Sequence, residues 1–441
     1  MYRNKLKDLI EWKNSKNRKP LILSGARQVG KTWLLKEEFA KKEYSSVAYV
    51  SFYGNAVAKD IFELDLNPER IIDALEVYCE TKIIPGETLI ILDEIQECPK
   101  ALAALKNFYE MTPDYHIAVA GSLLGVALHE NSSYPVGKVN SMTLYPLTFS
   151  EFLRASGRAN MADAIENGEF DTLISLHGNL LDLLKTYLVT GGMPEVVKNY
   201  LEEGNILKVR SIQQQIISDY IRDFSKHAPS AQVPKILEIF NILPAELAKE
   251  NKKFLFSMIR KGARAAEYEN ALLWLSNAGV VSRVRRVETV RSPLATYAEQ
   301  DAFKLYIMDV GLLGALSGLD PQVVLDGDRL FIEFKGAFAE QFVFQEFVAN
   351  GWSPYYYHKD KPSREVDFLL DFGHEILPIE VKSGKNTASA SLVAYMDETK
   401  PARAIKLSLK QEHRINRGLE YLPLYLAGAI KHKRNVDDFQ V

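Results

Sequence analysis

The chain is short of cysteine and has no long apolar run. Its 441 residues include two cysteines, Cys79 and Cys98, neither with His or Cys neighbours at zinc-ligand spacing. We therefore expect no disulfide framework and no zinc site, but two buried apolar side chains. No stretch approaches the roughly 18 apolar residues of a membrane-spanning helix, and residues 1–20 lack the apolar core of a signal peptide. These absences predict a cytoplasmic protein with no membrane partner.

A charge excess of either sign is also missing. The net charge of −3 excludes a uniformly basic protein that coats nucleic acid, although a local basic surface remains open. The content of 47% hydrophobic and 25% charged residues is typical of a chain that folds throughout. Its length predicts about two to four domains.

The segment "LILSGARQVGKTWLL" predicts a nucleotide site. A strand-like run precedes a match to GxxxxGK[ST], and a helical pattern follows it. In this context we expect backbone N–H groups to surround the phosphates of ATP, Lys31 to reach the β and γ phosphates, and Thr32 to ligate Mg²⁺. The predicted cofactor-binding residues are Gly25, Ala26, Arg27, Gln28, Val29, Gly30, Lys31 and Thr32.

Two further strands place polar side chains where they could serve this site. The run "TLIILDEIQ" indicates a buried parallel strand that ends in Asp93 and Glu94. We assign Asp93 to the Mg²⁺ shell and Glu94 to the activation of the attacking water. The run "YHIAVAGSLLG" places Ser122 just past a third strand, where it could touch the γ-phosphate or serve as a helix N-cap.

These residues resemble the AAA-type P-loop ATPases, with Asp93 and Glu94 as the second acidic motif and Ser122 as the polar sensor. The chain is more closely similar to a prokaryotic family that joins this ATPase to a carboxy-terminal domain of unknown function. That resemblance covers nearly the whole chain, because the family's motifs occur in order as "GARQVGKT", "LDEIQ", "AGSLLG", "YPLTFSEF", "TGGMPEVV" and "KLYIMDVGLL".

The middle of the chain has a helical pattern that suggests a lid over the nucleotide. The segment "TGGMP" interrupts it where many of the resembling ATPases carry an arginine sensor. Arg154 and Arg222 are the candidate replacements, although each also suits a solvated helix face.

Residues 235–291 predict a winged helix, with "GVVSRVRRVETV" as its β-wing. From Lys252 to Arg291 nine basic residues, among them Arg260 and Lys261, face three acidic ones. We expect Arg283, Arg285 and Arg286 to contact DNA phosphates, and a domain-packing winged helix is the alternative.

The carboxy-terminal part predicts a hairpin that gathers carboxylates. Asp367 lies on one strand of "SREVDFLLDFGHEILPIEVKSGK", while Glu380 and Lys382 share a face of the next. Two carboxylates that bind Mg²⁺ beside a lysine suit phosphodiester hydrolysis, and Glu340 is a further candidate ligand or base. The set resembles the PD-(D/E)xK nucleases, with Val366 where the family's proline is expected. An ordinary charged hairpin and a nuclease-like fold without catalysis are the alternatives.

The sequence therefore predicts an α/β multidomain protein. We expect a P-loop AAA-type parallel sheet in residues 1–150, a helical lid in 151–225, a winged-helix domain in 226–295 and a PD-(D/E)xK nuclease-like domain in 296–441. The predicted function is an Mg²⁺-dependent ATPase that acts with DNA, and nuclease activity, a homo-oligomer and a protein partner are left open. The rival hypothesis is an ATP-switched signalling or scaffold protein.

Overall fold

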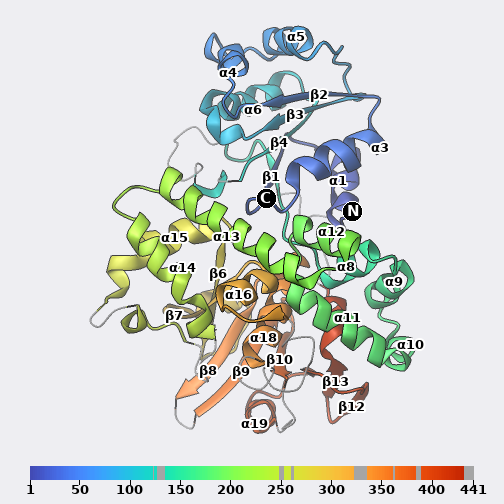
Figure 1. Cartoon of the computed structure of the whole chain (residues 1–441), viewed down its shortest axis with the longest axis vertical. Coiled ribbons are helices and arrows are strands. Elements are labelled where there is room, and N and C mark those ends of the chain that lie inside the picture. The colour runs from blue at the N-terminus through green and yellow to red at the C-terminus, as the bar shows by residue number, and fades with distance from the viewer. Residues whose placement is uncertain are drawn as a thin grey trace. The chain divides into compact units, whose positions relative to one another are not determined.

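The chain folds into two compact units, each described here by itself (Figure 1). The structure is a computed structural model that describes residues 1–122, 124–126, 135–247, 253–259, 263–321, 335–360, 363–383 and 389–431. The first unit contains Met1–Tyr145 and Asn277–Gly279, and the second contains the described residues of Pro146–Ser276 and Val280–Lys433. Of the helices within these ranges, none is long and apolar enough to cross a membrane.

A five-stranded sheet in which all strands run parallel forms the centre of the first unit. Every residue of β3 and β4 is buried, as expected for central strands that are covered on both faces. The strands, in the spatial order β2-β3-β4-β1-β5, are β1 Leu21–Ser24, β2 Ser46–Ser51, β3 Thr88–Asp93, β4 His116–Ala120 and β5 Asn140–Thr143. This sheet has the parallel α/β architecture that the sequence predicted for the nucleotide domain.

Helices pack on the sheet of the first unit. After the phosphate loop, α2 continues without a break through a π-helical turn, Leu34–Ala40, into α3. The α-helices are α1 Lys5–Asn14, α2 Lys31–Trp33, α3 Lys41–Glu43, α4 Ala56–Glu63, α5 Pro68–Cys79 and α6 Pro99–Met111. Both cysteines are unbridged, with Cys98 buried and Cys79 half-buried.

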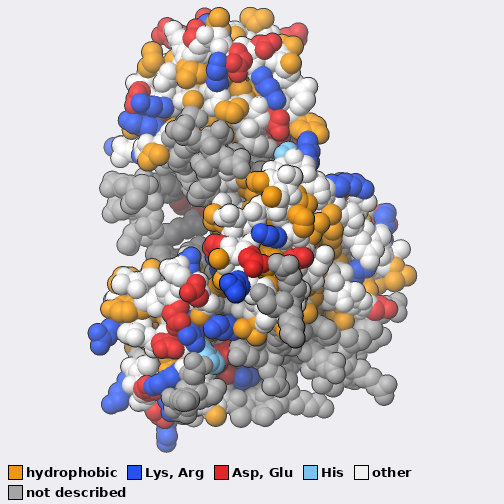
Figure 2. All heavy atoms as spheres, turned by 90° about the vertical axis from the view of Figure 1, so that its left-hand side faces the viewer, with side chains coloured by type: hydrophobic (Ala, Val, Ile, Leu, Met, Phe, Trp, Pro, Cys, Tyr) orange, Lys and Arg blue, Asp and Glu red, His pale blue; other side chains and the backbone are white. Residues whose placement is uncertain are grey.

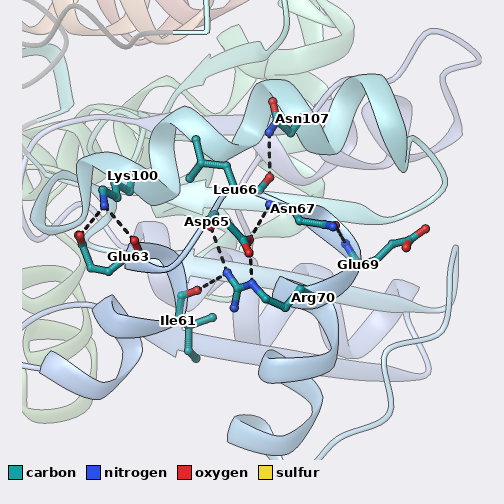
Figure 3. A network of polar contacts seen from close by, with 9 residues as sticks. All are labelled: Ile61, Glu63, Asp65, Leu66, Asn67, Glu69, Arg70, Lys100 and Asn107. Atoms are coloured by element: carbon teal, nitrogen blue, oxygen red, sulfur yellow. Dashed lines mark hydrogen bonds and ion pairs between the residues drawn. The ribbon is translucent and has the colours of Figure 1, made fainter.

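Polar contacts fix the corner between α4 and α5 (Figure 3). The Arg70 guanidinium donates to the Asp65 carboxylate at 2.7 Å and to the Ile61 carbonyl at 2.8 Å. From α6, the Asn107 amide donates to the Leu66 carbonyl at 2.8 Å and Lys100 bonds Glu63. Two of these bonds, to the Ile61 and Glu63 carbonyls, use backbone acceptors that the end of α4 leaves without helical partners.

The second unit is helical from Phe149 to His227, as the sequence predicted for this stretch. Its position over the nucleotide stays a prediction. The α-helices of the unit are α8 Phe149–Ala155, α9 Ala159–Asn167, α10 Phe170–Ser175, α11 His177–Thr190, α12 Pro194–Glu203, α13 Ile206–His227, α14 Val233–Leu247, α15 Ala265–Asn277, α16 Val310–Leu316, α18 Lys335–Ala349 and α19 Ala390–Thr399.

An eight-stranded mixed sheet completes the second unit, in the order β12-β13-β11-β10-β9-β8-β6-β7. The predicted carboxy-terminal hairpin is confirmed, because β9 and β10 pair antiparallel from Asp371 opposite Ile376. The strands are β6 Val281–Val287, β7 Ala298–Ile307, β8 Tyr355–Asp360, β9 Ser363–Asp371, β10 Ile376–Lys382, β11 Ala404–Ser408, β12 Arg414–Asn416 and β13 Leu419–Pro423.

The segment expected to form the β-wing of a separate winged helix, "GVVSRVRRVETV", contains β6, which belongs to this same sheet. β6 pairs antiparallel with β7 and parallel with β8, where Arg286 lies opposite Tyr356. The sheet therefore continues across residue 295, the predicted boundary between two domains. Lys252, Arg260 and Lys261 of the basic segment lie outside the described residues.

Three of the sequence motifs meet in a buried joint of the second unit. The Gly192 N–H donates to the Asp309 carboxylate at 2.6 Å, and the Leu147 N–H donates to the Gly192 carbonyl at 2.7 Å. A Cβ at Gly192 would overlap the Leu147 carbonyl oxygen, so only glycine fits. Hydrogen bonds thus link the segments "YPLTFSEF", "TGGMPEVV" and "KLYIMDVGLL". The glycine pair therefore has a packing role.

A second buried carboxyl lies in the same region. Glu346 of α18 accepts the Phe149 N–H at 2.7 Å and is 1% exposed. Burial raises the pKa of Glu346 to about 8; the Phe149 N–H opposes this rise and the nearby Glu151 carboxylate adds to it. The folded state is therefore more stable when the Glu346 carboxyl is neutral.

We expect the second unit to lose stability as the pH rises from about 4.5 to about 8, because the folded state holds the Glu346 proton more tightly than the unfolded state. Glu346→Gln keeps the hydrogen-bond acceptor without the charge. Wild type should lose unfolding free energy on the order of 4 kcal/mol over this pH range, and the variant should not show this loss. Denaturant unfolding at several pH values measures this, with the exposed Glu195→Gln as control. The same pH slope in wild type and Glu346→Gln would contradict the assignment.

Candidate functional site

The phosphate loop has the backbone that its glycines allow. It runs from the end of β1 to the start of α2 and contains positive φ angles at Gly25 (+138°), Gln28 (+64°) and Gly30 (+91°). A Cβ at Gly25 would overlap the Leu144 carbonyl oxygen, so this position needs glycine for space as well as for conformation. The predicted loop, residues 25–32, therefore lies at the carboxyl end of a central strand, where α/β folds bind ligands.

Lys31 lies beneath this loop and is 7% exposed. Its ammonium donates to the Gly25 carbonyl at 2.8 Å and to the Ala26 carbonyl at 2.7 Å. Burial lowers the pKa of Lys31 to about 8, while the charges of Glu94 and Asp93 oppose the shift. A buried ammonium that is held by carbonyl groups is poised for a ligand with strong negative charge.

Thr32 and Asp93 come together as the sequence predicted for an Mg²⁺ site. The Thr32 hydroxyl donates to Asp93 Oδ2 at 2.8 Å, and the Tyr49 hydroxyl from β2 donates to the same oxygen at 3.0 Å. A hydroxyl beside a carboxylate fits Mg²⁺, which needs few protein ligands when phosphate oxygens and water complete its shell. Sequence reasoning missed Tyr49, whose place on the strand beside β3 was the available signal.

Glu94 is held by two neighbouring side chains. Its Oε2 accepts the Gln96 amide at 2.5 Å and the Ser122 hydroxyl at 3.2 Å, while the Glu94 backbone has a left-handed φ of +52°. A Cβ at Gly121 would overlap the Gln96 side chain, so Gly121 leaves room for that amide. The structure thus brings Ser122 to Glu94, and it adds Gln96, which the sequence analysis missed.

The two arginines considered as sensors are both in the second unit. Arg154 forms ion pairs with Asp163 at 2.6 Å and Glu166 at 3.1 Å. Arg222 lies on the exposed face of α13 with Asp219 at 3.2 Å. Arg222 matches the solvated helix-face alternative, whereas Arg154, with a side chain that is 14% exposed, pairs with carboxylates of α9. A sensor role for either residue stays a prediction.

Two of the three arginines predicted to contact DNA form ion pairs with carboxylates of the second unit. Arg283 bonds Glu269 at 2.7 Å, and Arg286 bonds both carboxylate oxygens of Glu299, at 2.8 and 2.6 Å. Contact with phosphate would require both pairs to open. Nucleic-acid binding by Arg283, Arg285 and Arg286 therefore stays a prediction.

The carboxy-terminal candidates gather on one face of the second sheet. The Val381 N–H donates to Asp367 Oδ2 at 2.8 Å, and the Lys382 ammonium lies 2.6 Å from Glu380 Oε1. Glu340 of α18 accepts the Tyr306 hydroxyl at 3.2 Å. The structure thus brings Asp367, Glu380, Lys382 and Glu340 into one neighbourhood, as the sequence predicted.

A lysine that the sequence analysis missed is also present there. Lys304 of β7 is fully buried, and its ammonium lies 2.5 Å from Glu365, 3.7 Å from Glu340 and 4.0 Å from Asp367. Burial alone would lower the pKa of Lys304, but Glu340, Tyr306 and the other carboxylates hold it well above its usual value. Lys304 is thus a permanent cation beside the predicted metal ligands.

These surroundings do not fit a bound Mg²⁺. Within the described ranges no three Asp, Glu, His or Cys side chains are arranged to hold a metal ion. Asp367 and Glu340 face the Lys304 ammonium, and one oxygen of Glu380 faces Lys382. Among the described residues, Glu380 Oε2 has no hydrogen-bond partner, but one such oxygen does not make a metal site.

The match to known protein families agrees with the architecture of the first unit. Residues 17–153 match the model of a family described as an AAA domain, whereas residues 181–323 and 335–427 match two domains of unknown function, DUF8612 and DUF4143. No curated protein matches the chain. Residues 17–153 are thus similar to AAA-type P-loop ATPases, in line with the parallel sheet and the loop geometry.

Several solved structures align with the chain at low identity and with TM-scores below 0.5. A Walker-type ATPase of Pyrococcus abyssi is 15% identical with a TM-score of 0.45, covering 71% of this chain and 95% of its own. The Thermotoga maritima RuvB Holliday junction branch migration motor is 13% identical with a TM-score of 0.29, covering 64% and 90%. Cdc6p from Pyrobaculum aerophilum is 11% identical with a TM-score of 0.26, covering 74% and 95%.

We expect Gln96→Leu to lower the kcat of ATP hydrolysis about tenfold with little change in KM, because the amide orients Glu94 without reaching the nucleotide. Gln215→Leu, at an exposed position of α13, is the matched control. Steady-state ATPase kinetics of the three proteins measure the effect. A change in KM alone would show that Gln96 serves nucleotide binding.

Proposed function

We propose that the chain is an Mg²⁺-dependent cytoplasmic ATPase whose nucleotide state controls DNA binding or processing by its carboxy-terminal part. The observation that carries the ATPase proposal is the contact of Thr32 with Asp93 at 2.8 Å, beside the buried Lys31. It supports a nucleotide site in which the Lys31 ammonium faces the negative charge of the phosphates and the oxygens of Thr32 and Asp93 hold the metal ion. The AAA-domain match to residues 17–153 is independent support.

The roles of the side chains follow from their contacts. Backbone N–H groups of the loop and the Lys31 ammonium hold the phosphates, and Thr32 with Asp93 would hold Mg²⁺. The ion supplies neutralisation of the charge that develops on the phosphate oxygens. Glu94 accepts a proton from the attacking water, and Gln96 with Ser122 orients the accepting carboxylate. The reaction thus yields ADP and phosphate.

We expect Lys31→Ala to weaken ATP binding because it removes the ammonium that faces the phosphates. Glu94→Gln should retain binding and slow hydrolysis about 100-fold or more, because it removes only the proton acceptor. Equilibrium binding of a fluorescent ATP analogue and phosphate release measure the two effects. Equal loss of binding in both variants would contradict the role of Glu94.

DNA is proposed as a partner from the charge of one segment. The excess of basic over acidic residues between positions 252 and 291 supports phosphate contact there. Against this, lysines and arginines alternate with acidic side chains on the face of the molecule in Figure 2.

We expect the full chain to bind duplex DNA less tightly as salt rises, because phosphate contacts release counterions. Replacing Arg283, Arg285 and Arg286 by Gln should reduce the slope of log K against log salt by about one for each arginine that reaches a phosphate. Fluorescence anisotropy at several salt concentrations measures both slopes. An unchanged slope would show that these arginines pack within the protein and do not contact DNA phosphates.

A second candidate function is favoured by Lys304. An ATP-switched protein whose nuclease-like domain is catalytically inactive and binds a partner would explain an ammonium buried among the predicted metal ligands. The two candidates differ in metal-dependent cleavage of linear, supercoiled and branched DNA. The first predicts cleavage that Asp367→Ala abolishes, and the second predicts none on any substrate.

A further inference from the structure

Lys304 lies beside Asp367 and Glu340, two residues of the predicted metal site. Its ammonium is enclosed by three carboxylates from two elements: Glu340 from α18, and Glu365 and Asp367 from one face of β9. Tyr356 covers it from β8, with the ring centroid 4.9 Å away. The side chain is 0% exposed, so this charge has been moved wholly from water into the acidic cluster.

Each carboxylate near Lys304 already has a donor. Glu365 accepts the Lys304 ammonium at 2.5 Å, Glu340 accepts the Tyr306 hydroxyl at 3.2 Å, and Asp367 accepts the Val381 N–H at 2.8 Å. A divalent ion bound by these carboxylates would have to displace the Lys304 ammonium, whose side chain is 0% exposed. If the ammonium stayed in place, the ion would lie beside another positive charge, and the repulsion would weaken its binding.

We propose that Lys304 is a built-in cation that takes the place of the catalytic metal, so that the nuclease-like domain is closed to divalent ions and does not cleave DNA. The inference rests on the proposed nuclease-like arrangement of Asp367, Glu380 and Lys382, and it decides between the two candidate functions. A genuine metal site would leave its carboxylates facing a space open to solvent or substrate.

Lys304 and its carboxylate partners lie in different matched regions of the chain. Lys304 lies on β7, within the region 181–323 that matches one domain of unknown function, whereas its three carboxylate partners lie within 335–427, which matches the other. The buried cluster therefore joins the two matched regions. Lys304 comes from β7, which together with β6 continues the sheet of β8–β10.

The test is Mn²⁺ binding by the nucleotide-free full chain, followed by the electron paramagnetic resonance signal of unbound Mn²⁺. Wild type should show no Asp367-dependent site at millimolar Mn²⁺. The double variant Lys304→Gln with Glu365→Gln removes one charge of each sign, and should bind one Mn²⁺ at least about tenfold more tightly than wild type. Adding Asp367→Asn should abolish the gained site.

The matched control is Lys359→Gln with Glu398→Gln, which makes the same charge change at an exposed ion pair of 2.7 Å. If the first double variant does not fold, Lys304→Met with Glu365→Gln fills the same space with an apolar chain and takes its place. ATP hydrolysis should equal that of wild type in all these variants, so a failure of the ATPase proposal is seen separately.

Two results would overturn the proposal. The first is an Asp367-dependent Mn²⁺ site in wild type with the affinity of the Lys304 variants, because Lys304 would then not exclude the ion. The second is a folded Lys304 variant that gains no such site, because the carboxylates would then have no capacity for a metal. Gain of the site in the Lys304 variants, and not in the control, would support the proposal.

Discussion

A buried ammonium group must find negative charge or strong acceptors, and this constraint shapes both units of the protein. Lys31 donates to the carbonyl oxygens of Gly25 and Ala26, and burial lowers its pKa to about 8 although the charges of Glu94 and Asp93 oppose the shift. Lys304 finds carboxylates on several sides, which hold its pKa well above the usual value. Lys31 can therefore interact with phosphate, whereas the charge of Lys304 is neutralised by carboxylates of the protein itself.

The same difference separates what the two candidate sites can do. Around Lys31, the Thr32 hydroxyl and the Asp93 carboxylate share one hydrogen bond that a metal ion and phosphate oxygens can replace. Around Lys304, the carboxylates are bonded to groups of the chain itself. Similar residue types thus support nucleotide chemistry in one unit and a closed ionic cluster in the other.

Local sequence predicted the parts of the molecule that depend on local physics. The phosphate loop, the buried strand ending at Asp93 and the hairpin that carries Asp367 and Glu380 follow from glycine spacing, apolar runs and strand alternation. Contacts between distant segments could not be predicted in this way. Lys304 lies 36 residues before Glu340 (340 − 304 = 36), and no periodic pattern links them. The pairing of β6 with β8 is a long-range contact of the same kind, and it merges the predicted wing with the second sheet.

Hydrogen exchange of the full chain, resolved by mass spectrometry, tests the contrast between the two lysines most directly. The protein is compared alone, with Mg²⁺ and ATP, and with Mn²⁺ without nucleotide. The account predicts that Mg²⁺ and ATP slow exchange in residues 25–32, and that Mn²⁺ alone leaves exchange in residues 363–382 unchanged. Slower exchange in 363–382 with Mn²⁺, or no change in 25–32 with Mg²⁺ and ATP, would contradict it.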